Sequence, residues 1–244
     1  MNLIIDIGNT ATKLAVFQRD KILKTQSIAT SSLVLEVEDL LKKFPEIKQC
    51  ILSSVGYLSA EAFEFLKIRL PMIVLESKLK LPFQLQYKTP SSLGGDRLAL
   101  MAAAASQYAG KNVLVIDAGS CVTYDFIDAE KNYLGGSISP GINMRYKSLS
   151  DFTLKLPALQ KKIPKAYVGN STKSSIHSGV VNGLLYEIEG TVSTYQKKYA
   201  DLTVILTGGD ADFLCKQLKI SIFATSNFLL EGLNFLLELN SNQL

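Results

Sequence analysis

The sequence predicts an α/β protein built from two related lobes with mixed sheets. Of the 244 residues, 47% are hydrophobic and 20% are charged, which suits a well-buried globular chain. A strand–turn–strand segment, LIIDIGNTATKLAV from Leu3, recurs 111 residues later within VLVIDAGSCVTYDFI. Each copy is followed by alternating helical and extended patterns, as expected for α/β lobes.

The two hairpins set the expected domain organisation. A shift of 111 residues pairs four residues of the first with four of the second: Asp6 with Asp117, Gly8 with Gly119, Asn9 with Ser120 and Thr12 with Thr123. We therefore expect an N-terminal lobe over residues 1–111 and a C-terminal lobe over residues 112–244. No linker is long enough to separate independent domains.

The first lobe continues with helices and strands in alternation. Apolar residues at helical spacing predict a helix over residues 32–44, and CILSSV from Cys50 is a predicted strand. Ser59 is the expected N-cap of a second helix with acids in its first turn, and Met72 begins another strand. A Pro/Ser/Gly loop then leads into an alanine-rich helix that should end near Gly110.

The second lobe has a glycine-rich stretch after its hairpin, YLGGSISPGINM at residues 133–144. We expect a turn there, with SPGI as a structural turn. A long helix is predicted over residues 179–199. A strand from Leu202 then turns into a helix through TGGDA at residues 207–211, and residues 226–239 predict a closing helix.

Charge and cysteine content exclude several functions. The net charge of +4 contains no run of five like charges, so we expect no nucleic-acid or membrane partner. The amino terminus enters a strand directly, and no apolar stretch approaches the roughly 18 residues that span a bilayer, so a cytoplasmic protein is expected. Cys50, Cys121 and Cys215 form no CxxC pair. We expect reduced cysteines in or near a core, and a solvated or capping His177.

The candidate phosphate-binding segments are the two D-x-G turns and TGGDA, since neither GxxxxGK[ST] nor GxGxxG occurs. Backbone N–H groups of the first turn can cradle a phosphate, with the Thr12 hydroxyl and Lys13 ammonium nearby. A carboxylate repels bare phosphate, so Asp6 is explained if a metal ion lies between them. Asp-Gly and Gly-Asn are also common turn formers. Two copies together with TGGDA favour a nucleotide held between the lobes.

GGDR, residues 94–97, stands where the loop enters the alanine-rich helix. Asp96 could serve only as a first-turn acid that complements the helix dipole. Arg97 is electrostatically misplaced there unless it faces an anion or a carboxylate, so the pair suits a substrate with a hydroxyl to deprotonate and an anionic group to hold. An aspartate with a pKa of about 3.9 is a weak base, but phosphoryl transfer asks little of its base. GNSTKSS, residues 169–175, is either a substrate-binding loop or a plain surface loop.

The ordered set DIGNT, GGDR, DAGSCVTYD, GGSISPGI, GNST and TGGDA resembles the type III pantothenate kinases, from Asp6 to about Gly232. These belong to the superfamily of acetate kinase, sugar kinases, heat-shock chaperones and actin. The resemblance implies two ribonuclease H-like lobes in an actin-like ATPase architecture. It also implies ATP-dependent phosphorylation of pantothenate to 4'-phosphopantothenate, the first step of coenzyme A biosynthesis.

The resemblance implies roles for individual residues. Implied ATP contacts are Asp6, Ile7, Gly8, Asn9, Thr10, Ala11, Thr12, Lys13 and Ser120. Implied substrate contacts are Tyr87, Gly94, Gly95, Asp96, Arg97 and Thr172. Asp96 would accept the proton of the pantothenate hydroxyl, Asp6 would serve Mg²⁺ through water, and Asp117 would bind an activating monovalent cation, K⁺ or NH₄⁺. A homodimer packed through the second lobes is also implied.

Departures from the family pattern concern nucleotide affinity more than reaction type, and other functions on the same scaffold remain alternatives. Ser120 and Cys121 stand where threonine and alanine are usual, and Gly95 stands where alanine is common, which should loosen the helix start. The alternatives are a non-catalytic ATP-binding regulator on the same scaffold, a kinase of another small hydroxyl compound, and an actin-fold ATPase. Weak ATP binding and the absence of coenzyme A inhibition are further hypotheses that the resemblance implies.

Overall fold

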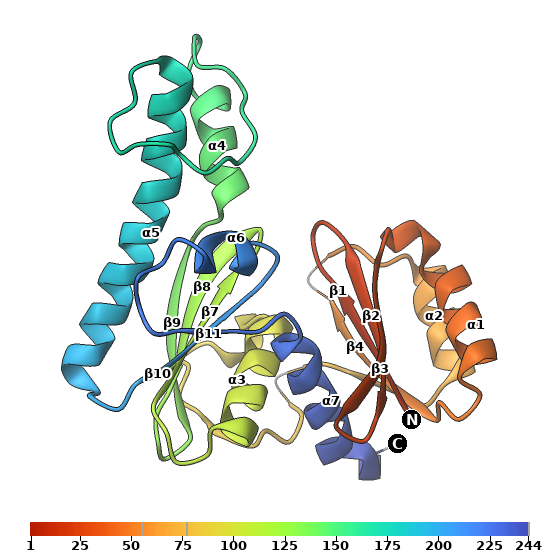
Figure 1. Ribbon diagram of the computed structural model, residues 1–244. Helices are drawn as coiled ribbons and strands as arrows, with labels where there is room; N and C mark the ends of the chain where they lie inside the picture. The colour runs from red at the N-terminus through yellow and green to blue at the C-terminus, as the bar shows by residue number, and fades with distance from the viewer. Residues whose placement is uncertain (55, 77, 244) are drawn as a thin grey trace. The chain divides into compact units, whose positions relative to one another are not determined.

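A computed structural model describes residues 1–54, 56–76 and 78–243 and divides the chain into two compact units (Figure 1). Unit 1 comprises Met1–Ala109, Lys131–Tyr133 and Asn227–Leu244, and unit 2 comprises Gly110–Glu130 and Leu134–Ser226. The first boundary lies two residues from the expected one. The closing helix was expected in the second lobe and instead clusters with unit 1.

Unit 1 contains a five-stranded mixed sheet in the order β3-β2-β1-β4-β5. Its strands are β1 (Asn2–Ile7), β2 (Thr12–Gln18), β3 (Lys21–Ile28), β4 (Gln49–Ser54) and β5 (Met72–Val74). The first three pair antiparallel, while β4 and β5 run parallel to β1. Sequence analysis did not predict β3, an edge strand without any fully buried residue and so without a clear apolar signal.

Helices cover both faces of this sheet (Figure 1). They are α1 (Leu33–Lys43), α2 (Ala60–Arg69), α3 (Gly95–Gln107) and α7 (Phe228–Asn240). On one face, α1 and α2 bury Val37, Leu40 and Leu66 against the apolar residues of β1 and β2. On the other face, α7 packs so closely on α3 that a Cβ at Gly232 would lie 1.9 Å from the Ala99 carbonyl oxygen. A glycine is therefore required at this helix crossing.

Unit 2 contains a second mixed sheet, in which β11, β10, β7, β8 and β9 are successive neighbours. The strands are β7 (Val113–Ala118), β8 (Cys121–Ile127), β9 (Asn132–Pro140, whose first two residues belong to unit 1), β10 (Thr203–Thr207) and β11 (Phe223–Ala224). We expected a glycine-rich turn within residues 133–144. That expectation is wrong for residues 133–140, because they belong to β9. A Cβ at Gly136 would lie 1.7 Å from the Tyr124 carbonyl oxygen, so this glycine serves a close backbone approach within the strand.

Three helices complete unit 2: α4 (Ile142–Asp151), α5 (Thr172–Lys198) and α6 (Ala211–Cys215). Sequence analysis missed α4 and placed the start of α5 seven residues late, at Gly179. The true start is a capping box, in which Ser171 and Ser174 each accept from the other's backbone N–H. His177, expected to be solvated or capping, instead lies on α5 with its Nδ1 2.8 Å from the Tyr146 hydroxyl of α4.

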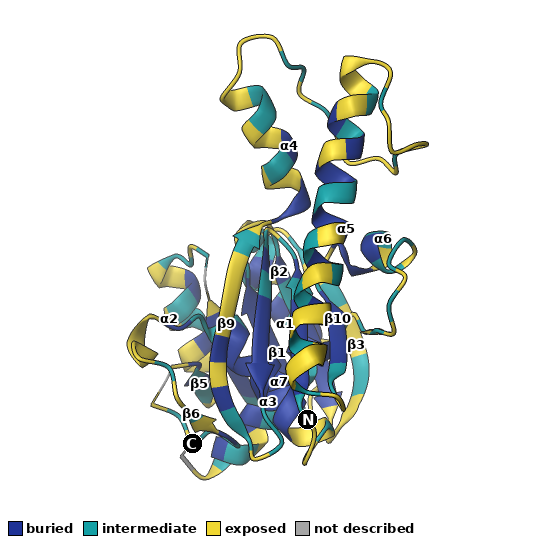
Figure 2. Cartoon of the chain, turned by 90° about the vertical axis from the view of Figure 1, so that its left-hand side faces the viewer, coloured by how far each residue is buried: buried dark blue, intermediate teal, exposed yellow. Residues whose placement is uncertain are grey.

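In unit 2, exposed residues predominate in the segment that joins α4 to α5 (Figure 2). Large apolar side chains stand exposed there, including Phe152, Leu154 and Val168. Among the helices of the described residues, none is long and apolar enough to cross a membrane. All three cysteines are free thiols. Cys50 is buried, and burial raises the pKa of its thiol to about 12.

Candidate active site

The first D-x-G turn joins β1 to β2 at residues 8–11 in unit 1. The Gly8 N–H donates to the Ala11 carbonyl at 3.1 Å, and the Gly56 N–H donates to the Ile7 carbonyl at 3.1 Å. A Cβ at Gly56 would lie 2.5 Å from the Gly8 carbonyl oxygen. The turn is thus packed closely from behind, while Asn9 and Thr10 are exposed on its outer side.

Asp6 lies at the end of β1 beside this turn. Lys13 is its cross-strand partner on β2, and Ser53 is its neighbour on β4. Burial raises the pKa of Asp6 to about 6, a rise that the Asp96 carboxylate supports and that Lys13 and Ser53 oppose. Although Ser53 influences this pKa, its buried hydroxyl makes no hydrogen bond of normal geometry within the described part of the chain.

GGDR forms the start of α3, with Gly94 as the N-cap. The Asp96 carboxylate folds back over it: Oδ1 accepts from the Arg97 N–H at 2.8 Å, and a Cβ at Gly94 would lie 2.4 Å from the same oxygen. A Cβ at Gly95 would lie 3.0 Å from Leu75 Cδ2 and 3.5 Å from Ser53 Oγ. The glycines therefore let the Asp96 carboxylate and the helix start approach the Asp6 neighbourhood closely.

Arg97 is only 6% exposed, and its guanidinium lies against Tyr87. Its Cζ is 5.5 Å from the centroid of the Tyr87 ring, and its Nη1 is 3.5 Å from the Tyr87 hydroxyl, at the outer limit of hydrogen bonding. The structure thus brings together Asp6, Lys13, Asp96, Arg97 and Tyr87 within unit 1.

The second D-x-G turn joins β7 to β8 in unit 2. Asp117 lies near the end of β7 and pairs with Thr207 of the parallel β10, so TGGDA begins beside it. The Asp210 N–H donates to the Ala118 carbonyl at 2.9 Å. Behind the turn, a Cβ at Gly141 would lie 2.4 Å from the Ser120 carbonyl oxygen. Gly141 of SPGI and Gly208 of TGGDA therefore both pack closely against the backbone that follows Asp117.

The expected match between Thr12 and Thr123 is wrong in register. Lys13 lies opposite Asp6, whereas Thr123 lies opposite Asp117, so the first turn is one residue longer. Thr12 is also fully buried, and its hydroxyl lies 2.9 Å from that of Thr30. The Thr12 side chain therefore lies inside the protein, in contact with Thr30.

Sequence analysis missed a charged pair at TGGDA. Lys161, on the segment between α4 and α5, donates a hydrogen bond to the buried Asp210 carboxylate. Its Nζ also lies 5.6 Å from the centroid of the Phe213 ring. The two partners are 49 residues apart in the chain, and a lysine among several in LQKKIPK carries no local signal of its partner.

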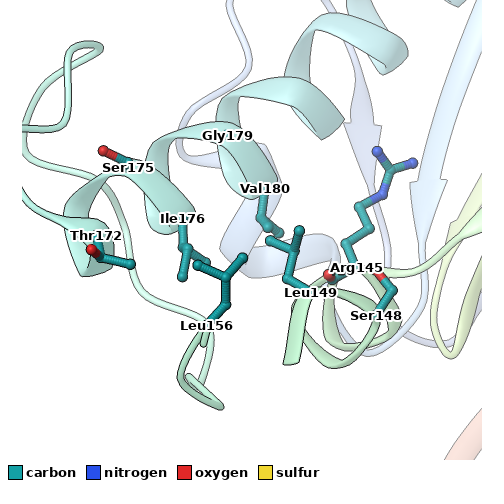
Figure 3. A pocket seen from close by; sticks show the side chains of 9 residues that line it. All are labelled: Arg145, Ser148, Leu149, Leu156, Thr172, Ser175, Ile176, Gly179 and Val180. Atoms are coloured by element: carbon teal, nitrogen blue, oxygen red, sulfur yellow. Dashed lines mark hydrogen bonds between the residues drawn. The ribbon is translucent and has the colours of Figure 1, made fainter. Parts of the chain in front are cut away.

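Thr172 lies at the rim of a cavity of about 520 Å³ between α4 and α5 (Figure 3). Leu149, Leu156, Ile176 and Val180 form its apolar wall. The Arg145 guanidinium points away from that wall, toward Glu187, to which it donates at 2.5 Å. Thr172, the last residue of GNST, is therefore both the first residue of α5 and part of the cavity edge.

Two places suit cations, although the described residues contain no cluster of three His, Cys, Asp or Glu ligands. In unit 1, Asp6 stands beside the unpartnered hydroxyl of Ser53, and in unit 2, Asp117 stands opposite Thr123, whose buried Oγ1 also lacks a partner among the described residues. Oxygen ligands of this kind suit Mg²⁺ and alkali cations, and Mg²⁺ usually keeps several waters.

The sequence matches the family model described as type III pantothenate kinase over residues 2–194. The type III pantothenate kinase of Christiangramia forsetii is 50% identical over 243 residues, covering 100% of both chains. That of Flavobacterium psychrophilum is 47% identical and covers 96% of this chain and 97% of its own.

Solved structures with a similar fold include the ROK family glucokinase of Streptomyces griseus with glucose and AMPPNP. It aligns with a TM-score of 0.54 at 13% identity and covers 99% of both chains. A Campylobacter jejuni protein, classed provisionally as a Baf family transcriptional activator, aligns with a TM-score of 0.62 at 24% identity over 98% of this chain and 99% of its own. At these identities the likeness concerns the fold alone, and it confirms the predicted actin-like α/β class.

Proposed function

We propose residue roles on the premise that the chain belongs to the type III pantothenate kinases. The protein accordingly uses ATP to phosphorylate pantothenate in coenzyme A biosynthesis. The observation that carries the assignment of roles is the grouping of Asp6, Lys13, Asp96 and Arg97 in one unit, where the Asp96 carboxylate acts on the pKa of Asp6.

Asp96 is the proton acceptor in this proposal. As the substrate hydroxyl oxygen forms its bond to the γ-phosphorus of ATP, the bond from that phosphorus to the β–γ bridging oxygen breaks, and ADP leaves. The hydroxyl proton passes to the Asp96 carboxylate, which the Arg97 N–H and the close approach to Gly94 hold in position. Since the transition state is loose, positioning contributes more than the basicity of this carboxylate.

The ATP phosphates lie at the turn of residues 8–11, with Lys13 as the nearby cation. Asp6 would hold Mg²⁺ through water beside Ser53. The ion, when bound, neutralises charge on the β- and γ-phosphates. It would also favour the ionised form of Asp6, whose pKa is raised to about 6, chiefly by burial.

Asp117 and Thr123 would hold K⁺ or NH₄⁺ in unit 2, next to the Ser120 contact proposed for ATP. The buried, unpartnered Thr123 hydroxyl supports this assignment, because a cation would satisfy an oxygen that otherwise pays a desolvation cost. The close approach of Gly208 to Asp117 supports it further, since Gly208 limits the positions that the carboxylate can take.

Tyr87, Gly94, Gly95 and Arg97 bind pantothenate in this proposal, with Arg97 attracting its carboxylate. Thr172 is a further contact, and a homodimer packed through unit 2 completes the site. The exposed Phe152, Leu154 and Val168 support a protein-covered face there. Light scattering of the purified protein tests the dimer, and a monomer at micromolar concentration would contradict it. A cytoplasmic location is part of the same proposal.

The decisive experiment measures pantothenate-dependent ADP release with Mg-ATP in K⁺, NH₄⁺ and Na⁺ buffers. We expect turnover that requires K⁺ or NH₄⁺ and is lost in Asp96→Asn. Glu61→Gln is the matched control, because it removes an exposed first-turn carboxylate from α2 and should keep full activity. Full turnover by Asp96→Asn would refute the base, and ATP binding without turnover in any buffer would favour the regulator alternative.

A further inference from the structure

Behind the Tyr87–Arg97 contact lies a third residue, Tyr133, that sequence analysis did not single out. Its ring stacks on that of Tyr87, with centroids 6.3 Å apart and an interplanar angle of 5°. The Phe83 ring meets Tyr133 edge-on at 5.9 Å and 80°. Aromatic pairs prefer these separations, so Tyr133 holds a defined place between two other rings.

The backbone fixes the same arrangement. The short strand β6 (Gln84–Leu85) pairs in parallel with the first residues of β9, placing Leu85 opposite Tyr133. The Gln86 N–H donates to the Tyr133 carbonyl at 3.1 Å, and the Gln86 Nε2 donates to Asn132 Oδ1 at 3.0 Å. Since Tyr87 directly follows Gln86 in the chain, this strand pairing brings the Tyr87 ring alongside the Tyr133 ring.

Burial differs along this series of side chains. Tyr133 is fully buried and Arg97 is 6% exposed, whereas Tyr87 is half-buried. A half-buried tyrosine can adopt more than one rotamer, and a guanidinium that rests on its ring would then also vary in position. Stacking on the fully buried Tyr133 ring restricts Tyr87 to one rotamer.

We propose that Tyr133 is a positioning residue for substrate recognition: by stacking on Tyr87 it fixes the ring face that orients the Arg97 guanidinium. The proposal rests on the proposed function in so far as Arg97 attracts the substrate carboxylate. Tyr133 acts through Tyr87 and contacts neither substrate nor nucleotide in this account.

The first test observes Arg97 directly and needs no turnover. The sequence contains four arginines, Arg19, Arg69, Arg97 and Arg145, so the Nε–H region of a ¹⁵N-arginine-labelled sample holds few signals. Arg97→Lys identifies its signal. In the wild type and in Tyr133→Phe, we expect the ring current of Tyr87 to displace the chemical shift of the Arg97 Nε–H signal. In Tyr133→Leu, we expect this signal near the chemical shift of free arginine.

The matched control is Phe228→Leu, which removes a buried aromatic ring from α7 in the same unit. It should leave the Arg97 signal in place. If Tyr133→Leu does not fold, Tyr133→Met serves as the second variant, because methionine fills an apolar site without a ring face. An unchanged Arg97 signal in a folded Tyr133→Leu or Tyr133→Met variant would overturn the proposal.

The second test separates positioning from a structural role by steady-state kinetics. In Tyr133→Leu we expect the KM for pantothenate to rise about tenfold or more, with the KM for ATP unchanged within about twofold. Tyr133→Phe should restore the wild-type values, and Phe228→Leu should keep them. Equal changes in both KM values would overturn the proposal. An inactive wild type would instead refute the proposed function, and the Arg97 signal would then decide the role of Tyr133.

Discussion

Gly208 lies directly against the carboxylate of Asp117: a Cβ at position 208 would lie 2.3 Å from Oδ1. Gly208 also has a φ of +96°, in a region that side chains disfavour. Both facts leave no room for a side chain at position 208 beside the Asp117 carboxylate.

Gly208→Ala should therefore impair the proposed cation site. We expect a loss of about 1–3 kcal/mol in the free energy of unfolding from backbone strain. We also expect a several-fold rise in the K⁺ concentration for half-maximal activity. Gly209→Ala is the control, because a Cβ there meets no atom within 4 Å. Equal K⁺ responses in the two variants would contradict this account of Asp117.

The raised pKa of Asp6 makes stability depend on pH. Its folded value of about 6 exceeds its ordinary value of 3.8, so between these pH values the folded protein binds more protons than the unfolded chain. Without Mg²⁺, this group should lower the free energy of unfolding as pH rises from 4 to 6, by on the order of 3 kcal/mol, with no further loss above that range.

Asp6→Asn should remove this part of the pH dependence. Urea unfolding at several pH values measures it, and the difference between variant and wild type isolates Asp6 from other carboxylates. We expect Asp6→Asn to be more stable than the wild type at neutral pH and to lose kinase activity. Asp20→Asn, at an exposed carboxylate of the β2–β3 turn, should keep the wild-type slope. If Asp6→Asn also kept that slope, burial of Asp6 would not be its cause.

Lys161→Met should leave the Asp210 carboxylate buried without its cation. Because Lys161 itself is about one-third exposed, we expect a modest loss, about 1–2 kcal/mol in the free energy of unfolding. The KM for ATP should rise because TGGDA loses its anchor. Asp210→Asn in the same chain should recover part of the stability, and Lys162→Met is the exposed neighbouring control. A single variant as stable as this control would contradict the pairing.

Two helical glycines should respond to alanine with opposite signs. Gly232→Ala would place a Cβ 1.9 Å from the Ala99 carbonyl oxygen, so α7 must move away from α3, and we expect a loss of about 3 kcal/mol or more. Gly190→Ala, on α5 with open space around its Cβ, should gain about 0.5–1 kcal/mol from helix propensity. Thermal unfolding measures both, and a stabilised Gly232→Ala would refute the close helix crossing.

Features with a local cause could be predicted from the sequence. The α2 N-cap is Ser59 as expected, since its Oγ accepts from the Ala62 N–H at 3.2 Å, and apolar periodicity found α1 and α7. The start of α5 was missed because its capping box uses a second serine, Ser174, instead of the more familiar glutamate. The strand β9 was missed because glycine usually indicates a turn. Here Gly136 allows a close backbone contact with β8, and nothing in the neighbouring sequence indicates that contact.

In the candidate site, too, features with a local cause could be predicted and contacts between distant segments could not. Asp6 and Asp96 could be singled out because each stands within two residues of the end of its element, beside a glycine-containing turn, and the Asp96 carboxylate helps to raise the pKa of Asp6. The burial of Thr12 by Thr30 depends on how β2 meets the segment after β3, and the stacking of Tyr87 on Tyr133 depends on the β6–β9 pairing. Such contacts between distant segments leave no trace in spacing.

The division into units also has a consequence for dissecting the gene. Unit 1 consists of three separate stretches of chain, so the polypeptide passes between the units four times and no single scission yields either one whole. Truncation after Ser226 would remove α7 and strip α3 of its partner. A circular permutant that begins at Asn227 and joins the former C-terminus to Met1 would keep α7 beside β1, where Asn2 Nδ2 donates to Asn234 Oδ1 at 2.9 Å. Permutation therefore joins two of the three stretches of unit 1 into one, while Lys131–Tyr133 remains a separate stretch.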